Sequence, residues 1–227
     1  AADEDLAEAD RASRIAMQLA PDLADAHVAR GFAMSLLRKY DEAERHFETA
    51  ARINPQLYDT YYLHGRACFA RGEIERSAEL FAKAAAVRPE DFQSCYLAGQ
   101  SLHMCGRGAE GRSVVAESIR RAERVLALNP RDVRTLSLGG GALFRDGQTD
   151  RAFEWCRRAL EVDPNDMSAI INAALVHVMA GLAEQGLDLL ERAFSLGWGK
   201  RDWVEHDPDY DILRDDPRFL KLLARLK

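Results

Sequence analysis

The sequence of 227 residues contains no apolar run approaching the roughly 20 residues that a membrane-spanning helix requires. Its amino-terminal residues are acidic and lack the basic start and the apolar stretch of a secretory signal. Cations are also in deficit, because 31 Lys and Arg against 37 Asp and Glu give a net charge of −6. A protein that binds nucleic acid needs surplus cations to displace counterions from phosphates. The composition therefore argues against a membrane or nucleic-acid partner.

Cysteines and aromatic residues are scarce. The four cysteines, Cys68, Cys95, Cys105 and Cys156, show no CxxC spacing, and a chain of this length does not need disulfides to fold. We therefore expect reduced thiols and a cytoplasmic location. Aromatic residues make up only 8% of the sequence, whereas Ala, Leu, Glu and Arg are abundant. These abundant residues are strong helix formers, so the composition favours an all-α fold.

The motifs that mark common enzyme sites are missing as well. There is no GxGxxG following a strand, no P-loop, no GxSxG and no HExxH. The three glycines at 139–141 fall inside a predicted helix, and we interpret them as a place of close helix packing rather than a phosphate-binding loop. None of the six histidines has a histidine four residues away or a cysteine at zinc-binding spacing. We therefore expect no enzymatic activity, no cofactor and no metal site.

Proline and glycine recur along the chain with one period. Steps of 34 residues separate Pro21 from Pro55 and Pro55 from Pro89, and the same step separates Gly31 from Gly65. Both series contain one longer step of 41 residues, which corresponds to seven extra residues. Several landmarks that share one period and one insertion indicate an internal repeat. A third series of small residues keeps the same step and consists of Ala43, Ser77, Ala152 and Gly186.

Each repeat has the pattern of two amphipathic helices. In the second repeat, residues 59–72 form the first predicted helix, which ends at the turn glycine Gly72. Residues 73–89 contain the second helix, which ends before Pro89 because proline cannot continue a helix. A single helix pair cannot bury its apolar face alone, so the pairs must stack on one another. The pattern predicts an all-α array of helix-turn-helix repeats.

The repeats resemble those of the tetratricopeptide repeat family. A glycine in the first helix, a small residue early in the second helix, an aromatic four residues later and a terminal proline recur in GFAMSLLRKYDEAERHFETAARINP and GRACFARGEIERSAELFAKAAAVRP. The resemblance covers residues 22–198 as five helix pairs, and it implies a right-handed superhelix. Three residues depart from the pattern: Arg38 replaces the turn glycine, Cys156 replaces the aromatic, and Trp198 replaces the proline.

Two places interrupt the regular array. Residues 1–21 have the pattern of a second helix without its first, which fits either a cut within a longer array or a natural amino-terminal cap. The seven extra residues fall in the third repeat, where we expect Gly108 and Gly111 to loosen the turn. Seven residues are two helical turns, so the insertion should lengthen the second helix and keep its buried face. The longer helix is either a protruding edge for a partner or a tolerated extension.

Residues 199–227 follow the last repeat and predict two short helices that cap the array. Asp207-Pro208 and Asp216-Pro217 each place a capping carboxylate before a proline at the first helical position. The expected buried stripe consists of Leu213, Phe219, Leu220 and Leu223.

This tail resembles a terminal segment that closes repeat arrays in bacterial multidomain signalling proteins. The resemblance implies a bacterial source and a position after a nucleotide cyclase, a Ser/Thr kinase or a DNA-binding regulator domain. The matching residues are Trp203, Glu205, Asp207, Leu213, Arg214, Pro217, Arg218 and Phe219.

The resemblance to tetratricopeptide repeats also implies a concave groove lined by the first helices of the repeats. Arg66 and Gln100 are polar residues flanked by apolar ones, and we predict that they face this groove beside aromatic residues of the kind enriched at interfaces. Tyr62, Phe69 and Phe144 could instead pack between repeats. The predicted groove residues are Tyr62, Arg66, Phe69, Tyr96, Gln100, His103, Arg134, Phe144 and Asn172.

These observations predict one domain, residues 1–227, consisting of a half repeat (1–21), five helix pairs (22–198) and a capping tail (199–227). The predicted function is a protein-interaction scaffold or regulatory module that binds a protein or peptide in the groove. One alternative is a small-ligand sensor that regulates an attached effector domain, and another is self-assembly of the repeats into a homo-oligomer. An enclosed pocket near Arg66, Gln100 and Arg134 would favour the sensor.

Overall fold

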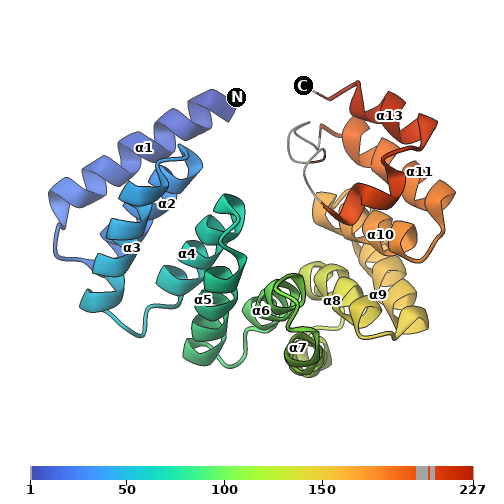
Figure 1. The fold of residues 1–227 in the computed structure, drawn as a ribbon, viewed down its shortest axis with the longest axis horizontal. Helices are drawn as coiled ribbons and strands as arrows, with labels where there is room; N and C mark the ends of the chain where they lie inside the picture. Colours follow the sequence, from blue (N-terminus) through green and yellow to red (C-terminus); the bar gives the residue numbers. More distant parts are fainter. Residues whose placement is uncertain (1, 198–203, 205–207, 227) are drawn as a thin grey trace. The chain divides into compact units, whose positions relative to one another are not determined.

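The computed structural model describes residues 2–197, residue 204 and residues 208–226. Within these residues the regular secondary structure is helical and contains no strand, which confirms the predicted all-α fold (Figure 1). The chain divides into two compact units, which we call unit 1 (Ala1–Glu117) and unit 2 (Ser118–Lys227). Helix α7 is continuous across this division.

Unit 1 consists of α1 followed by successive helix pairs. α2 packs on α3 and α4 packs on α5, and α5 then packs on α6, the first helix of the next pair (Figure 1). The turns inside the pairs are short, so the two helices of a pair lie side by side. The helices of unit 1 are α1 (Ala2–Leu19), α2 (Ala24–Leu36), α3 (Tyr40–Ile53), α4 (Tyr58–Arg71), α5 (Ile74–Val87), α6 (Phe92–Met104) and the first part of α7 (Gly108–Leu128).

Unit 2 continues the same pattern and ends in the tail. α8 packs on α9 and α10 packs on α11, while α10 also contacts α8 of the preceding pair. The remaining elements of unit 2 are α8 (Val133–Arg145), α9 (Thr149–Val162), α10 (Met167–Met179), α11 (Ala183–Ser195), the 3-10 helix η1 (Pro208–Leu213) and α13 (Pro217–Leu223).

The turn inside each pair is closed by a residue with left-handed backbone conformation. After α4 the N–H of Gly72 donates to the carbonyl of Phe69 (3.0 Å), and the N–H of Glu73 donates to the carbonyl of Cys68 (2.9 Å). These bonds satisfy carbonyls that the end of a helix leaves unpaired. Arg38 adopts the same conformation in the first pair, with φ 58°, although it is not glycine. The later pairs have glycine at this position: Gly106, Gly147 and Gly181.

Inside a pair, glycine in the first helix makes room for a bulky side chain of the second. A Cβ on Gly31 would lie 3.0 Å from the ring of Phe47, and a Cβ on Gly65 would lie 3.0 Å from the ring of Phe81. Both phenylalanine rings are almost completely buried. The glycine and aromatic positions of the repeat therefore form a single packing contact.

The run of glycines at 139–141 serves the same purpose in the fourth pair. A Cβ on Gly140 would lie 2.7 Å from Sγ of Cys156, and a Cβ on Gly139 would overlap the ring of Trp155. The interpretation of these residues as a place of close helix packing is confirmed at Gly139 and Gly140.

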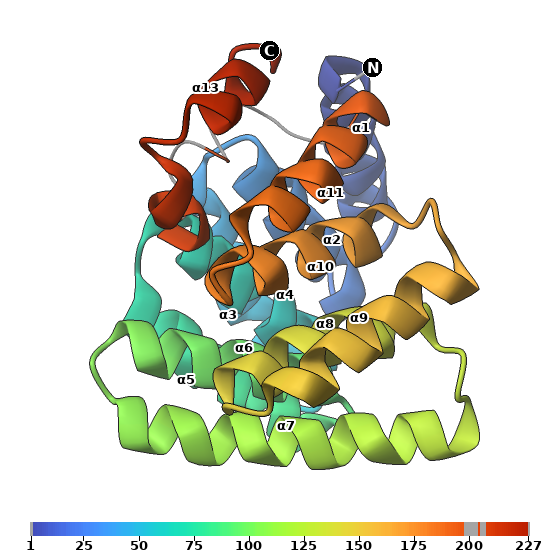
Figure 2. The same cartoon turned by 90° about the vertical axis from the view of Figure 1, so that its right-hand side faces the viewer.

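The seven extra residues of the third repeat lengthen its second helix, as the sequence predicts. α7 has 21 residues, whereas α3 has 14, and Figure 2 shows the greater length of α7. The expectation that Gly108 and Gly111 loosen the preceding turn is wrong, because both lie within α7. A Cβ on Gly111 would lie 2.8 Å from the carbonyl oxygen of Gly99, so Gly111 permits close contact between α6 and α7.

The tail covers the last helix pair. Asp216 caps α13, and its Oδ1 accepts hydrogen bonds from the N–H groups of Arg218 (2.7 Å) and Phe219 (3.1 Å). Phe219 stacks on Tyr210 of η1, with ring centroids 5.8 Å apart. The apolar side chains of the tail join one buried cluster with α10 and α11, and the tail members of this cluster are Val204, Tyr210, Leu213, Phe219, Leu222 and Leu223.

The predicted buried stripe of the tail needs one correction. Leu213, Phe219 and Leu223 are buried, but Leu220 is 49% exposed and Leu222 takes its place in the core at 2%. Leu220 and Leu222 flank the Phe219–Leu223 face at similar angles, so the packing of α13 on the last helix pair decides which of them is buried. Part of the tail motif lies outside the described residues, namely Trp203, Glu205 and Asp207, as does Trp198 at the end of the repeats.

Helix α1 occupies most of the predicted half repeat (1–21) and packs on α2. The guanidinium of Arg30 in α2 donates to the carboxylate of Asp10 (2.6 Å) and to the hydroxyl of Ser13 (3.2 Å). On another side of α1, Ile15 and Leu19 are exposed to solvent. No helix in the described parts of the chain is both long and apolar enough to cross a membrane.

Candidate functional site

The predicted groove residues of α4 combine an anchored aromatic ring with an exposed cation. Tyr62 stacks on Tyr58, with ring centroids 5.4 Å apart, and is tilted against Phe81 at 6.0 Å. Arg66 lies one turn further along α4, and its guanidinium carbon is 6.0 Å from the centre of the Tyr62 ring. Arg66 is exposed, while Tyr62 and Phe69 are half-buried. The structure therefore holds the ring in place and leaves the cation accessible.

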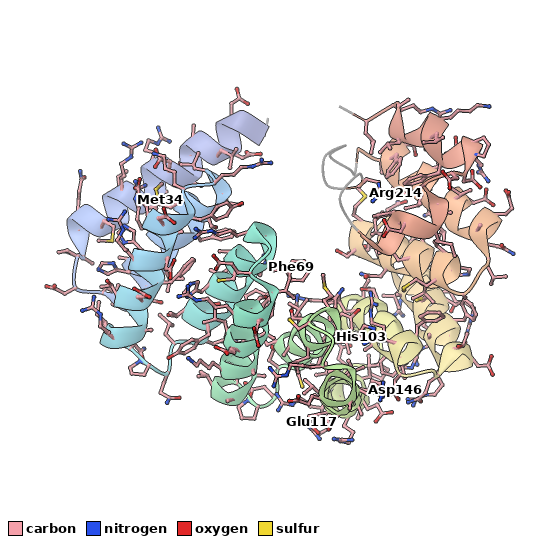
Figure 3. The ribbon with its side chains drawn as sticks, in the orientation of Figure 1. Met34, Phe69, His103, Glu117, Asp146 and Arg214 are labelled. Carbon is pink, nitrogen blue, oxygen red and sulfur yellow. The ribbon has the colours of Figure 1, made fainter. Side chains whose placement is uncertain are left out.

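Helix α6 contributes polar side chains next to this part of α4. Nε2 of Gln93 donates to the hydroxyl of Tyr62 (2.8 Å), which links the first helices of two successive repeats. Gln100 is half-buried and His103 is exposed (Figure 3). Tyr96 is only 9% exposed, so little of its surface is accessible to a ligand. We call Tyr62, Arg66, Gln100 and His103 the α4–α6 surface.

The other predicted groove residues belong to unit 2. Arg134 is exposed on α8, and Phe144 is half-buried near the end of the same helix. Asn172 lies on the neighbouring helix α10, where its Nδ2 donates to the carbonyl of Ser168 one turn earlier (2.8 Å). The amide of Asn172 therefore already has one partner within its own helix.

A polar cluster that sequence reasoning missed holds the second and third repeats together. The hydroxyl of Tyr58 lies 2.9 Å from Oγ of Ser94 and donates to the carboxylate of Asp91 (3.1 Å). The guanidinium carbon of Arg88 is 3.8 Å from the centre of the Tyr58 ring. Burial, together with the nearby carboxylate, raises the pKa of Tyr58 above its usual value. The one signal in the sequence is Asp91, whose position before α6 is typical of a helix cap.

Two histidines also meet in the structure although they are 19 residues apart. Nδ1 of His27 in α2 lies 3.1 Å from Nδ1 of His46 in α3, and Nε2 of His27 lies 2.9 Å from the carbonyl oxygen of Pro21. A carbonyl oxygen can only accept a hydrogen bond, so Nε2–H of His27 donates to it. Nδ1 of a neutral His27 then accepts a hydrogen bond from Nδ1–H of His46. Burial, and then the charge of His27, lowers the pKa of His46. A search for histidines on one helix could not find this pair.

His64 is the most deeply buried titratable ring of unit 1, with 6% exposure. It stacks on Phe47 with centroids 5.0 Å apart. Its Nε2 and the hydroxyl of Thr60, one turn earlier on α4, have no hydrogen-bond partner among the described residues. Burial lowers the pKa of His64 to about 4.

Cys68 and Cys156 are both buried. Burial raises the pKa of Cys68 and of Cys156 to about 12, so both are protonated and poorly nucleophilic at neutral pH. Among the described residues, no group of three or more His, Cys, Asp or Glu side chains could hold a metal ion.

Comparisons with known proteins agree with this architecture. Residues 24–57, which contain the first helix pair, match a family model described as tetratricopeptide repeat. Residues 104–168, from the end of α6 to the start of α10, match a second model with the same description. Together with the helix-turn-helix fold, the two matches support the tetratricopeptide repeat family. A comparison with curated proteins finds no significant match.

Several solved structures share the fold. The chain is similar to YrrB, whose structure is described as a TPR protein with an unusual peptide-binding site, with 19% identity, a TM-score of 0.51, and coverage of 92% of this chain and 96% of that one. It is also similar to TTC0263, a thermophilic TPR protein of Thermus thermophilus, with 17% identity, a TM-score of 0.59, and coverage of 89% and 98%.

A third similar structure is the Cut9–Hcn1 hetero-tetramer of the APC/C, with 15% identity and a TM-score of 0.64. The match covers 97% of this chain but 46% of the Cut9–Hcn1 chain. At these levels of identity the three similarities establish the fold alone. A ligand of this chain has to be inferred from its own residues.

Proposed function

We propose that the chain is a protein-interaction module and that the α4–α6 surface holds a segment of a partner protein or peptide. The observation that carries this proposal is the pairing of an anchored ring, Tyr62, with the exposed guanidinium of Arg66. Aromatic and arginine side chains dominate the binding energy of protein interfaces. The tetratricopeptide repeat fold supports the same role, because stacked helix pairs expose extended surfaces to partners.

The polar groups of this surface are available to a ligand. Within the described part of the chain, the side chains of Arg66, Gln100 and His103 form no hydrogen bond and no ion pair. A guanidinium can bind a carboxylate through two parallel hydrogen bonds, and an amide can both donate to and accept from a peptide backbone. The surface therefore suits a peptide segment that has an acidic side chain beside exposed backbone groups.

Charge reversal at one position tests this proposal. Arg66→Glu should remove partners that wild-type protein captures from lysate, because it places a like charge opposite the acidic group of the ligand. The matched control is Arg112→Glu on α7, since Arg112 is also exposed and forms no ion pair with a described residue. Quantitative mass spectrometry of the captured proteins provides the measurement. Identical partner lists for wild type and Arg66→Glu would contradict the assignment of the surface.

We also propose three finer features of this role. Arg134, Phe144 and Asn172 on unit 2 also contact a partner, residues 1–227 fold as one domain, and the module regulates an effector domain of a bacterial signalling protein in the cytoplasm. The continuity of α7 across the two units supports a single domain. Unfolding transitions that coincide when probed in α4 and in α10 would support it, and separate transitions would oppose it.

Self-assembly is a second candidate, favoured by the exposed apolar side chains of α1. Ile15 is 48% exposed and Leu19, one turn further, is 80% exposed. Exposed apolar groups that adjoin one another suit an interface between copies of the chain. Sedimentation of wild type and of the double variant Ile15→Lys, Leu19→Lys at the same concentrations tests this candidate. If the wild type is a homo-oligomer, the double variant should dissociate. A monomeric wild type excludes self-assembly.

A further inference from the structure

Unit 1 contains a cavity of 200 Å³ among α3, α4 and α5, away from the α4–α6 surface. The α4 residues that line it are Thr60, Tyr61 and His64. Residues two positions apart on a helix point in directions about 200° apart, so Thr60 and His64 lie on the side of α4 opposite to Tyr62 and Arg66. The cavity is also smaller than the roughly 300–1,000 Å³ of pockets for drug-sized ligands. Its occupant must be small.

Two of the residues that line this cavity have a buried polar side-chain atom without a partner. The hydroxyl of Thr60 and Nε2 of His64 lie one helical turn apart and make no hydrogen bond with any described residue. Thr60 is 1% exposed, so its hydroxyl is also removed from bulk water. Buried polar groups in folded proteins nearly always have a partner, and each exception requires an explanation. Of the three such side chains among the described residues, Thr60 and His64 line this cavity, and the third, Ser101, lies on α6.

The rest of the wall is apolar, and the mouth has charges of both signs. Phe47 stacks on His64, and Leu80 of α5 lines the cavity beside them. At the mouth, Glu79 and Lys83 are exposed on α5, four residues apart. Neither side chain forms an ion pair or a hydrogen bond within the described part of the chain.

Another cation at the mouth is already neutralised. The guanidinium of Arg76 lies 2.5 Å from the carboxylate of Glu44 and 3.6 Å from that of Glu48. The charges left for a ligand are therefore the carboxylate of Glu79 and the ammonium of Lys83. A molecule that fits must present one cation and one anion at its outer end and a hydrogen-bonding group at its inner end.

We propose that this cavity binds a free amino acid with a hydroxyl or amide side chain. Its α-carboxylate meets Lys83, its α-ammonium meets Glu79, and its side chain passes Phe47 and Leu80 to bond with Thr60 and His64. The low pKa of His64 keeps the ring neutral at neutral pH, so Nε2 can donate to or accept from a hydroxyl or amide. This binding is independent of the partner surface on the other side of α4.

Titration of the full chain with single amino acids tests the proposal. NMR signals of the Thr60 methyl group and the His64 ring should shift in a saturable way with at least one of L-threonine, L-serine, L-asparagine and L-glutamine. L-Valine is the matched probe for L-threonine, because it has the same shape without the hydroxyl. We expect it to bind at least about tenfold more weakly, since it leaves the buried polar groups unpaired.

Variants separate this site from the rest of the molecule. Thr60→Val and His64→Phe keep the shape of the wall and remove the unpaired polar groups, so both should fold. In Thr60→Val the His64 ring signals should no longer shift on titration, and in His64→Phe the Thr60 methyl signal should no longer shift. Arg112→Glu on α7, which does not line the cavity, should bind the same amino acid as wild type. No saturable shift with any of the four probes would overturn the proposal and leave a cavity that holds water only. Unchanged binding in both wall variants would also overturn it.

Discussion

The imidazole of His64 lies nearly parallel to the phenyl ring of Phe47, with 5.0 Å between the centroids and 16° between the planes. This stacking excludes water from the ring and disfavours its charged form. Arg76 and Lys83 act in the same direction, and Glu44 opposes them, so that the pKa of His64 falls from 6.5 to about 4. The folded protein therefore keeps this histidine neutral at pH values where the unfolded chain protonates it.

The stability of the protein should consequently decrease in mild acid. Between pH 6.5 and about 4 the unfolded chain binds a proton at His64 that the folded chain does not bind, so the free energy of unfolding falls with pH over this window. His64 should lower the free energy of unfolding by about 3 kcal/mol at the acid end of this window, and it should have no effect above pH 6.5. Urea unfolding at a series of pH values measures it. His64→Phe should lack this part of the pH dependence, and parallel curves for the two proteins would contradict the prediction.

Replacing Arg38 by glycine should stabilise the protein. Arg38 has φ 58° at a turn where the other helix pairs have glycine, and a side chain raises the energy of this conformation. We expect Arg38→Gly to raise the free energy of unfolding by about 0.5–1 kcal/mol. The reciprocal change Gly72→Ala, at φ 85°, should lower it by about 1 kcal/mol. Chemical denaturation of the two variants provides the measurement, and destabilisation by Arg38→Gly would refute the account of this turn.

Gly111 and Gly108 should respond in opposite ways to the same substitution. A Cβ at Gly111 would lie 2.8 Å from the backbone oxygen of Gly99, which cannot move without separating α6 from α7. Gly111→Ala should therefore destabilise the protein by about 1–3 kcal/mol. A Cβ at Gly108 has no neighbour closer than 3.6 Å, so Gly108→Ala should be neutral or slightly stabilising because alanine favours the helix. Thermal unfolding of both variants distinguishes packing from helix propensity.

Phe219 should be the main apolar contact by which the tail protects the last helix pair. It is completely buried against Tyr210 and the core of α10 and α11. Phe219→Ala should cost about 3–5 kcal/mol because it leaves a cavity in this cluster. In an array of nearest-neighbour contacts the loss should appear first in α10 and α11 and should spare α4 and α5. Hydrogen exchange along the chain measures this, with Leu220→Ala, an exposed neighbour, as the control. If protection in α10 and α11 stays unchanged and partner binding is lost, the tail is a recognition element.

The helix pairs could be predicted from the sequence because their signals are local. Proline ends a helix and glycine or a strained residue such as Arg38 closes its turn through the backbone of a few neighbouring residues. These signals recur with one period, so the helix boundaries, the lengthened α7 and the capping carboxylate of Asp216 all follow from residue order. The α4–α6 surface was predictable only as a set of positions on first helices, and its role as a binding surface remains a proposal.

Only the tertiary structure determines the contacts between residues that are far apart in the chain. The proximity of His27 and His46, the burial of Tyr96 and the close approach of Gly111 to Gly99 depend on how one helix rests on the next. Leu220 and Leu222 have the same hydrophobicity, and only the position of α13 on the last pair determines which of them is buried. Likewise, the isolation of the Thr60 and His64 polar groups arises from packing among three helices. Periodicity determines where helices begin and end, but side-chain volumes and backbone clearance at each contact determine what they enclose.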